Sequence, residues 1–198
     1  MSGWLELWKQ TEGFLRGVLV KPPLPGAQSL SLDLGSGYIV PQAPPGLRES
    51  RDLAHAHPLL RERYLRLKDE FQRATGHCLF ETQVYRSPEA QFELYKKGRE
   101  FRGPEAQRTD PLLWVIVDDR SKVTNCDGFR RKSRHNRFPS EAIDTCVDRD
   151  PGPGKVVDWK PELYKPLGEL ALKFNLVWGG TFRGFGPHGD YPHLEVLL

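Results

Sequence analysis

Two short stretches, far apart in the chain, contain the residues that most constrain its fold. The first runs from Ser133 to Asp144 and the second from Asp190 to Glu195. Together they offer two imidazoles and a carboxylate, in His135, Asp144 and His193. Catalytic zinc takes three such protein ligands and keeps a fourth position for a water whose pKa it lowers to about 7. We therefore predict a Zn²⁺ site, for which the chain must fold so that both stretches meet.

The pattern around His193 predicts on which side of a strand it lies. The tail from His193 to Val196 alternates polar and apolar residues. As a strand it would direct His193 away from the face on which Leu194 and Val196 enter the core. Asp190 follows a glycine-containing, turn-like run that can fold its carboxylate back toward the metal water. We expect Asp190 to act as general base and then as the acid that protonates the leaving amine.

Four other residues provide alternative metal ligands. His188 lies five residues before His193 but lacks the Asp-x-Pro-His setting that His193 has. Asp118, Asp119 and Asp127 could also bind a metal, although acidic residues near strand ends are usually solvated. These four stay open as alternatives to the set predicted above.

The first stretch resembles the signature of a peptidase family. Ser133, His135, Ser140, Ala142 and Asp144 are similar to the Ser-x-His... Gly-x-Ala-x-Asp pattern of the M15 zinc peptidases. That family includes D-Ala-D-Ala carboxypeptidases and dipeptidases, and phage L-alanyl-D-glutamate endolysins. The interval from His135 to Asp144 is nine residues, longer than the common pattern, and Ser140 stands where Gly is usual. We interpret this as a longer loop between the same two ligands.

Further stretches carry the same resemblance, in the family's order. The segment from Tyr85 to Arg99 is similar to a Tyr-Arg-Ser... Gln... Leu-Tyr... Gly-Arg run, and Trp178–Gly180 is similar to the turn before the last metal strand. The resemblance implies that Arg86 stabilises the oxyanion of the tetrahedral intermediate, and that Gln91 and Ser133 bind substrate with Arg86. A guanidinium suits that task because its fixed donors favour developing negative charge. An acidic residue three positions before the last zinc ligand completes the pattern in Asp190, Pro192 and His193.

Hydrophobic periodicity predicts the secondary structure. Helices are expected to begin at Pro58, Pro88 and Pro161, because proline favours the first helical position. Strands are expected over Cys78–Arg86, with Phe80, Thr82 and Val84 on one face, and over Leu112–Val117 and Leu176–Trp178. Residues 99–111 are expected to form a loop. The resemblance implies an α+β fold, similar to the DD-peptidase and hedgehog fold, whose small antiparallel sheet carries the metal and packs helices on its other face.

The N-terminal part differs in pattern from the rest. We expect an arm and linker over residues 1–50 and the zinc peptidase domain over residues 51–198. Near the start, apolar residues recur at helical spacing before a proline-rich segment. Such a stripe most often packs on a core or docks as an arm, while membrane-surface association or assembly onto a partner stays open. Its members are Trp4, Leu7, Trp8, Phe14, Leu15 and Val18.

Composition excludes some function classes. The net charge of +3 is too small to argue for nucleic-acid binding, but it suits an anionic surface such as a bacterial cell wall. No apolar run approaches the length of a membrane-spanning helix. The positive charge gathers next to His135, where it forms either a solvated loop or a surface that attracts a carboxylate-bearing substrate. It lies in Arg130, Arg131, Lys132, Arg134 and Arg137.

Cysteine usage and the N-terminus bear on the compartment. Three cysteines without a CxxC pair indicate neither a disulfide framework nor a cysteine-based zinc site. The first residues lack the pattern of a secretory signal. We therefore expect synthesis in a host cytoplasm and access to the cell wall through lysis, with a monomer favoured.

The candidate ligands predict a zinc metallopeptidase, and the family resemblance implies that its substrates are peptidoglycan stem peptides. The first interpretation is a phage endolysin that cuts between L-Ala and D-Glu, and the second is a D-Ala-D-Ala carboxypeptidase or dipeptidase with the same ligands and base. A third is a non-catalytic cell-wall-binding or virion component on the same fold. Asp190 and Arg86 favour an enzyme, because a structural zinc would need neither and would take a fourth protein ligand.

Overall fold

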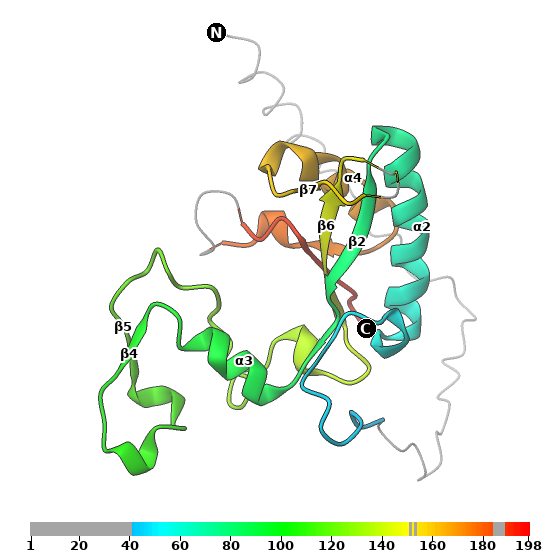
Figure 1. Cartoon of the computed structure of the whole chain (residues 1–198). Coiled ribbons are helices and arrows are strands. Elements are labelled where there is room, and N and C mark those ends of the chain that lie inside the picture. The colour runs from blue at the N-terminus through cyan, green and yellow to red at the C-terminus, as the bar shows by residue number, and fades with distance from the viewer. Residues whose placement is uncertain (1–40, 151, 153, 184–188) are drawn as a thin grey trace, which may run out of the picture. The chain divides into compact units, whose positions relative to one another are not determined.

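An antiparallel sheet carries both predicted metal-ligand stretches (Figure 1). The computed structural model describes residues 41–150, 152, 154–183 and 189–198, and within them this sheet has five strands. Together with the helices packed on it, the sheet gives the α+β class that was predicted. Its strands lie in the order β2 (Cys78–Gln83), β6 (Ala142–Asp148), β9 (His193–Glu195) and β8 (Val177–Trp178), with β7 (Val157–Asp158) also paired to β6.

The central strand β6 sets the geometry of the sheet. Its alternation sends Ile143 and Val147 into the core, while Asp144 between them faces the other way. In the antiparallel pair of β6 with β9, Ile143 lies opposite Leu194 and Asp144 lies opposite His193. Directly opposed residues of such a pair have Cβ atoms about 4.5–5.5 Å apart on one face of the sheet. The ladder therefore places two of the predicted ligands side by side.

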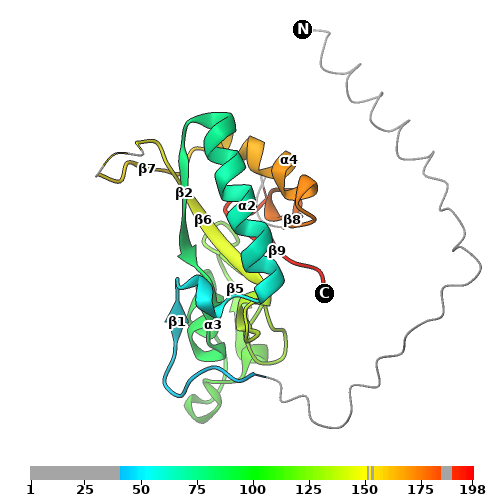
Figure 2. The ribbon, with the colours of Figure 1, turned by 90° about the vertical axis from the view of Figure 1, so that its right-hand side faces the viewer.

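Helix α2 (Pro58–Thr75) covers one face of the sheet (Figure 2). Its buried residues Leu60, Tyr64, Leu67 and Phe71 recur at spacings of four, three and four, which is one stripe of an α-helix. The Tyr64 hydroxyl also lies 3.0 Å from the Thr145 hydroxyl of β6. The helix ends as predicted, before a glycine in the left-handed conformation at Gly76.

Helix α4 (Lys165–Lys173) packs against α2 and β8 and completes the core. Leu167 and Ala171 are fully buried there, together with Leu194 and Val196 from the C-terminal tail. The predicted start at Pro161 forms a separate 3₁₀ turn, Pro161–Tyr164, and the α-helix begins after it. Because Ile143, Val147 and Leu194 point toward these helices, Asp144 and His193 lie on the opposite face.

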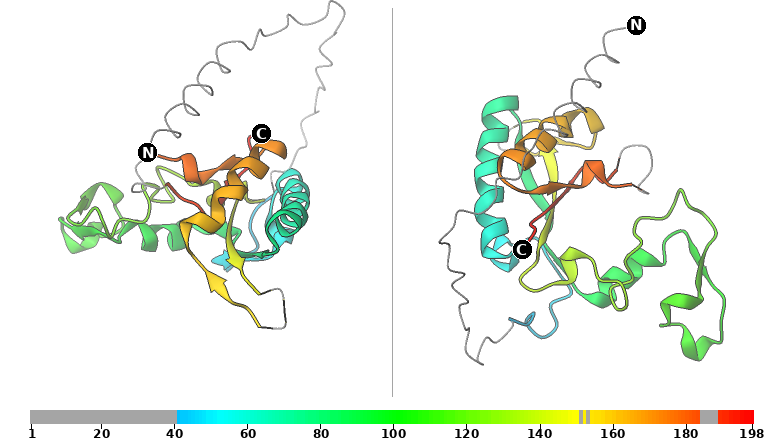
Figure 3. Two further views of the ribbon diagram at one scale, coloured as in Figure 1. Left: turned by 90° about the horizontal axis from the view of Figure 1, so that it is seen from above. Right: turned by 180° about the vertical axis from the view of Figure 1, so that it is seen from behind.

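Residues 88–116 extend away from the sheet (Figure 3). Helix α3 (Pro88–Tyr95) begins at the predicted cap, where the Ser87 hydroxyl accepts the Ala90 amide. It leads into a hairpin of β4 (Arg99–Phe101) and β5 (Trp114–Ile116). The prediction of a loop over residues 99–111 is therefore wrong for residues 99–101, which form β4.

Two other expectations are corrected by long-range pairing. The predicted strand over Cys78–Arg86 is divided into β2 and β3 (Tyr85–Arg86), because the register against β6 shifts between Glu81 and Gln83. The irregularity exchanges the faces of the strand, so the core takes Leu79 and Val84 rather than Phe80, Thr82 and Val84 together. Strand β3 also pairs with β1 (Glu49–Ser50), the last two residues before the position at which the peptidase domain is expected to begin.

The N-terminal apolar stripe and His188 lie outside the described residues. Within the described part, no helix combines the length and the apolar character that crossing a membrane requires.

Candidate functional site

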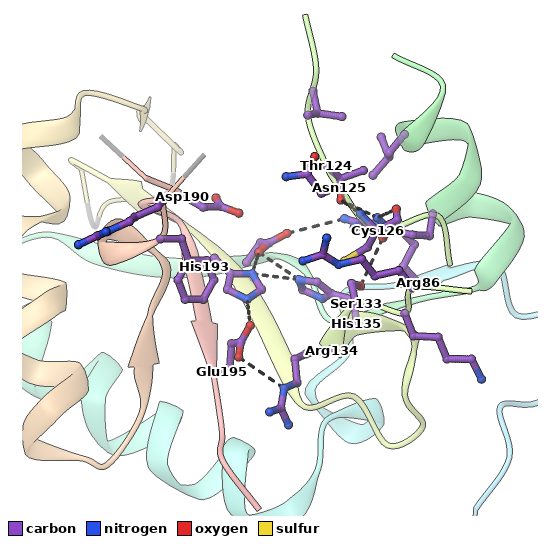
Figure 4. Close-up of a pocket in the computed structure, with 18 residues that line it drawn as sticks. Arg86, Thr124, Asn125, Cys126, Ser133, Arg134, His135, Asp190, His193 and Glu195 are labelled. Carbon is purple, nitrogen blue, oxygen red and sulfur yellow. Dashed lines mark hydrogen bonds and ion pairs between the residues drawn. The ribbon is translucent and has the colours of Figure 1, made fainter. Parts of the chain in front are cut away.

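Three elements bring the predicted ligands together on the polar face of the sheet (Figure 4). His135 lies on the 3₁₀ turn η4 (Arg134–Asn136), Asp144 on β6 and His193 on β9. One possible ligand atom from each of the three side chains lies within 4.8 Å of the others. Among the described residues this is the only such group of three or more His, Cys, Asp or Glu side chains. Both imidazoles are buried, and Asp144 is partly exposed.

The ring of His135 is oriented by the backbone behind it. Its Nδ1 lies 2.6 Å from the carbonyl oxygen of Val84, and a carbonyl can only accept, so Nδ1 carries the hydrogen. The lone pair of Nε2 then faces the cluster, 3.1 Å from Asp144 Oδ1 and 3.3 Å from His193 Nδ1. A backbone carbonyl is a common partner for the non-coordinating nitrogen of a metal-bound histidine. Val84 thus holds His135 in a form suited to bind a metal.

The ring of His193 directs its Nδ1 toward the cluster, whereas His135 directs its Nε2 there. Its Nδ1 lies 2.8 Å from Asp144 Oδ1, and its Nε2 lies 3.0 Å from Glu195 Oε1. Glu195 is two residues along the same strand and therefore lies on the same face. It was not among the predicted site residues, although the polar–apolar alternation of the tail already put both side chains on one side.

The charge balance of the cluster suits a bound cation. Burial raises the pKa of Asp144, but His135 and His193 beside it hold that pKa well below its ordinary value. Burial lowers the pKa of His193, whereas hydrogen bonds to Asp144 and Glu195 raise it to about 10. In the metal-free protein a proton on Nδ1 of His193 therefore lies where the ligand atoms converge. A divalent metal fits the same place, because all three atoms can donate a lone pair.

Arg86 lies beside this cluster at the end of β3. Its side chain is 12 % exposed, its Nη1 donates to Gln91 Oε1 at 2.9 Å, and its Nη2 is 3.7 Å from Asp144 Oδ2. The buried Nε lies 3.8 Å from Glu49 and has no hydrogen-bond partner within the described part of the chain. The side chain therefore turns Nη2, rather than the buried Nε, toward the cluster.

The other two predicted substrate-binding residues, Gln91 and Ser133, lie in the lining of the same cleft as Arg86. Gln91 is only 1 % exposed, and its amide nitrogen donates to Thr124 Oγ1 and to the Cys126 carbonyl. Its oxygen accepts from Arg86 and, at 3.4 Å, from the Ser133 hydroxyl. The polar atoms of Gln91 are thus engaged within the protein, and its oxygen helps to hold the Arg86 guanidinium in place. Ser133 is half-buried and also lines the cleft.

Asp190 lies on the turn that leads into β9, and Figure 4 shows its carboxylate pointing into the cleft. Its backbone is held against Gly179, whose carbonyl accepts the Asp190 amide at 2.8 Å. A Cβ on Gly179 would lie 2.4 Å from the Asp190 carbonyl oxygen, so this approach requires glycine. Burial raises the pKa of Asp190, as does the negative charge of Asp144, while His193, His135 and Arg86 oppose them more weakly.

These side chains share one cleft of about 640 Å³. One wall is formed by the sheet and the turn before β9, and the other by α3 and the segment that leads to η4. The mouth carries the exposed cations Arg131, Lys132 and Arg183, together with apolar side chains of Leu94 and Val123. Of the basic cluster predicted beside His135, Arg134 and Arg137 are instead paired with Glu141.

The alternative acidic ligands serve the loops in which they lie. Asp127 accepts the backbone amides of residues 129–131, and Asp118 accepts the Arg120 amide and the Ser121 hydroxyl. Asp119 is exposed and pairs with Lys122. These contacts stabilise turns, and the three side chains do not form a metal-binding group in the described structure.

Comparison with known proteins gives matches among solved structures. No family model and no curated protein matches the chain. The crystal structure of the L-Ala D-Glu endopeptidase ChiX of Serratia marcescens is 18% identical, with a TM-score of 0.44 over 73% of this chain and 83% of that chain. A variant of the vancomycin-resistance D,D-pentapeptidase VanY from a VanB-type cassette, in complex with Zn(II), is 19% identical, with a TM-score of 0.41 over 71% and 72%. At these values the likeness concerns the course of the chain and assigns neither an activity nor a substrate.

Proposed function

We propose that this protein is a zinc-dependent peptidase that hydrolyses the stem peptides of peptidoglycan. The observation that carries the proposal is the convergence of His135, Asp144 and His193 at a cleft that also contains Asp190 and Arg86. Three protein ligands at a cleft leave a coordination position for water, which is the arrangement of catalytic rather than structural zinc. When bound there, zinc would supply a Lewis acid and lower the pKa of that water.

The remaining chemistry falls to side chains that line the cleft. Asp190 is placed to take a proton from the attacking water and return it to the amine of the leaving peptide. Its raised pKa suits this exchange, because a carboxylate that titrates closer to neutral pH can both accept and give a proton. Arg86, whose Nη2 lies on the cluster side, would stabilise negative charge on the oxygen of the scissile carbonyl.

Charge at the cleft mouth supports an anionic peptide as substrate. Arg131, Lys132 and Arg183 are exposed there. Asp144 and Glu195 direct their carboxylates to the histidines rather than to these three cations. The cations can therefore contact a ligand. Peptidoglycan stem peptides carry free carboxylates at their D-Glu and at their D-Ala terminus. Within this class we propose cleavage between L-Ala and D-Glu, as in a phage endolysin, on the basis of the motif resemblance.

The test is incubation of the purified full chain with peptidoglycan, with and without a chelator, followed by mass spectrometry of the new ends. An endopeptidase of this specificity exposes the amine of D-Glu, whereas a carboxypeptidase releases free D-Ala and a dipeptidase acts on D-Ala-D-Ala. Zinc added back after chelation should restore the activity. Asp119→Asn, at a surface position away from the cleft, is a control that should keep it.

Each result decides between the interpretations. Release of D-Ala without exposed D-Glu amine would keep the zinc peptidase and reject the endopeptidase. Binding to peptidoglycan without any chelator-sensitive release would reject both enzymes and favour the non-catalytic wall-binding or virion component.

A further inference from the structure

Glu195 has contacts that the proposed chemistry does not use. Its Oε1 accepts from Nε2 of His193 at 3.0 Å, on the side of the ring that faces away from Asp144. The Glu195 side chain is 16 % exposed. A carboxylate behind the ring cannot bind the same ion as Nδ1, because the two ring nitrogens point in diverging directions.

The other oxygen of Glu195 is held by the neighbouring metal-ligand turn. Arg134 Nε lies 3.5 Å from Glu195 Oε2, and Arg134 is directly before His135 on η4. The same guanidinium donates to Glu141, which is 7 % exposed and also pairs with Arg137 at 2.7 Å. The Arg134–Glu195 pair thus joins the turn that carries one histidine to the strand that carries the other.

We propose that Glu195, held by Arg134, is a positioning residue for zinc, which rests on the zinc site proposed above. By accepting the Nε2 hydrogen, Glu195 fixes the tautomer of His193 that leaves the Nδ1 lone pair for the metal. By pairing with Arg134, it also fixes the distance between His193 and His135 in the absence of metal. Partners of this kind change metal affinity by about 10–100-fold when removed.

The measurement is zinc affinity by chelator competition in the intact chain, with cobalt absorption as a second probe of coordination. We expect Glu195→Ala to weaken zinc binding by about 10–100-fold. Glu195→Gln should weaken it less, because its amide oxygen can still accept from Nε2 while the ion pair with Arg134 is lost. In both variants peptidase activity should return at saturating zinc, since Glu195 does not touch the reacting atoms.

A matched control separates positioning from general stability. Glu81 on β2 is similarly buried, at 17 % side-chain exposure, and forms an ion pair with Lys68 at 2.9 Å. Glu81→Gln should therefore cost a comparable amount of fold stability and leave zinc affinity unchanged. Arg134→Met should weaken zinc binding in the wild-type background and have no further effect in Glu195→Ala, because Arg134 acts through Glu195.

The outcomes distinguish this inference from the proposed function. Wild-type protein that binds no zinc would overturn both. Wild-type protein that binds zinc, with Glu195→Ala and Glu195→Gln binding it equally well, would overturn the positioning role alone. If Glu195→Ala does not fold, the comparison of Glu195→Gln with Glu81→Gln still decides, because both variants preserve side-chain size.

Discussion

Three carboxylates in the cleft have three different environments. Asp144 lies between two imidazoles, which hold its pKa far below its ordinary value despite burial. Asp190 is half-buried near that negative charge, so its pKa is raised. Glu195 is half-buried too, but His193 and Arg134 lower its pKa. Groups whose pKa values are pushed apart in this way are suited to different roles. Asp190 is thus the carboxylate best suited to carry a proton, while the other two hold fixed negative charge.

Replacing Asp190 with asparagine tests that division at a single residue. Asp190→Asn should lower kcat by about 10²–10⁴-fold, because the amide cannot accept the proton of the attacking water. Zinc affinity should change only a few-fold, since Asp190 is not one of the three converging ligands. Stem-peptide hydrolysis and chelator competition measure the two effects. A variant with normal turnover would remove Asp190 from the mechanism.

Replacing Arg86 with lysine tests the oxyanion role. Lysine keeps the charge but loses the planar set of donors that reaches Gln91 and the cluster. We expect kcat to fall by about 10²-fold with a smaller change in KM, which is the result of removing one oxyanion donor. A rise in KM with unchanged kcat would instead mean that Arg86 only binds substrate.

At the scale of elements, the site depends on how closely the turn before β9 approaches β8. Gly179 follows β8 directly and accepts the Asp190 amide, while the same stretch positions the start of β9. An added Cβ at Gly179 would lie 2.4 Å from the Asp190 carbonyl oxygen and 2.8 Å from the Cβ of His193. One small residue therefore allows both Asp190 and His193 to take their places.

Gly179→Ala should disturb this turn and the site together. We expect a loss of about 1–3 kcal/mol in the free energy of unfolding, typical of overpacking, together with weaker zinc binding. Gly154→Ala is the control, since a Cβ at Gly154 would meet no atom within 4 Å. Denaturant unfolding and zinc titration of both variants measure the effect. Equal behaviour of the two would mean that the approach at Gly179 can relax without cost.

At the scale of the whole molecule, the sheet separates stability from chemistry. Its one face packs on α2 and α4 through fully buried apolar side chains, and its other face carries Asp144 and His193. Stability and chemistry are nevertheless linked through the protonation of His193, whose hydrogen bonds to Asp144 and Glu195 raise its pKa to about 10 from the ordinary 6.5. The stability of the metal-free protein therefore depends on pH, and zinc binding competes with the protonation of His193.

The sign of this coupling predicts opposite pH effects with and without zinc. Because the pKa of His193 is higher in the folded state, its protonation stabilises the metal-free fold fully below pH 6.5, and this is lost as the pH rises toward about 10. Zinc must displace the same proton, so its association constant should rise by up to about tenfold per pH unit in this window. Thermal melts and zinc titrations between pH 6 and 9 measure both trends. Zinc affinity that does not vary with pH would contradict the coupling.

Local patterns in the sequence determined the elements and the candidate ligands. The four-three-four spacing from Leu60 to Phe71 predicted helix α2, and the alternation from His193 to Val196 predicted which face of β9 is buried. Both patterns repeat over a few residues, so they report which side of an element is apolar without any knowledge of its neighbours.

Only the tertiary structure decided the pairing between segments. The register that sets Asp144 opposite His193, the irregularity between Glu81 and Gln83, and the burial of Gln91 all depend on contacts between residues far apart in the chain. A one-residue slip in such a ladder reverses the face of every side chain, and no local pattern specifies which partner a strand meets. For the same reason the sequence did not predict the ion pair between Glu195 and Arg134, which joins two segments far apart in the chain.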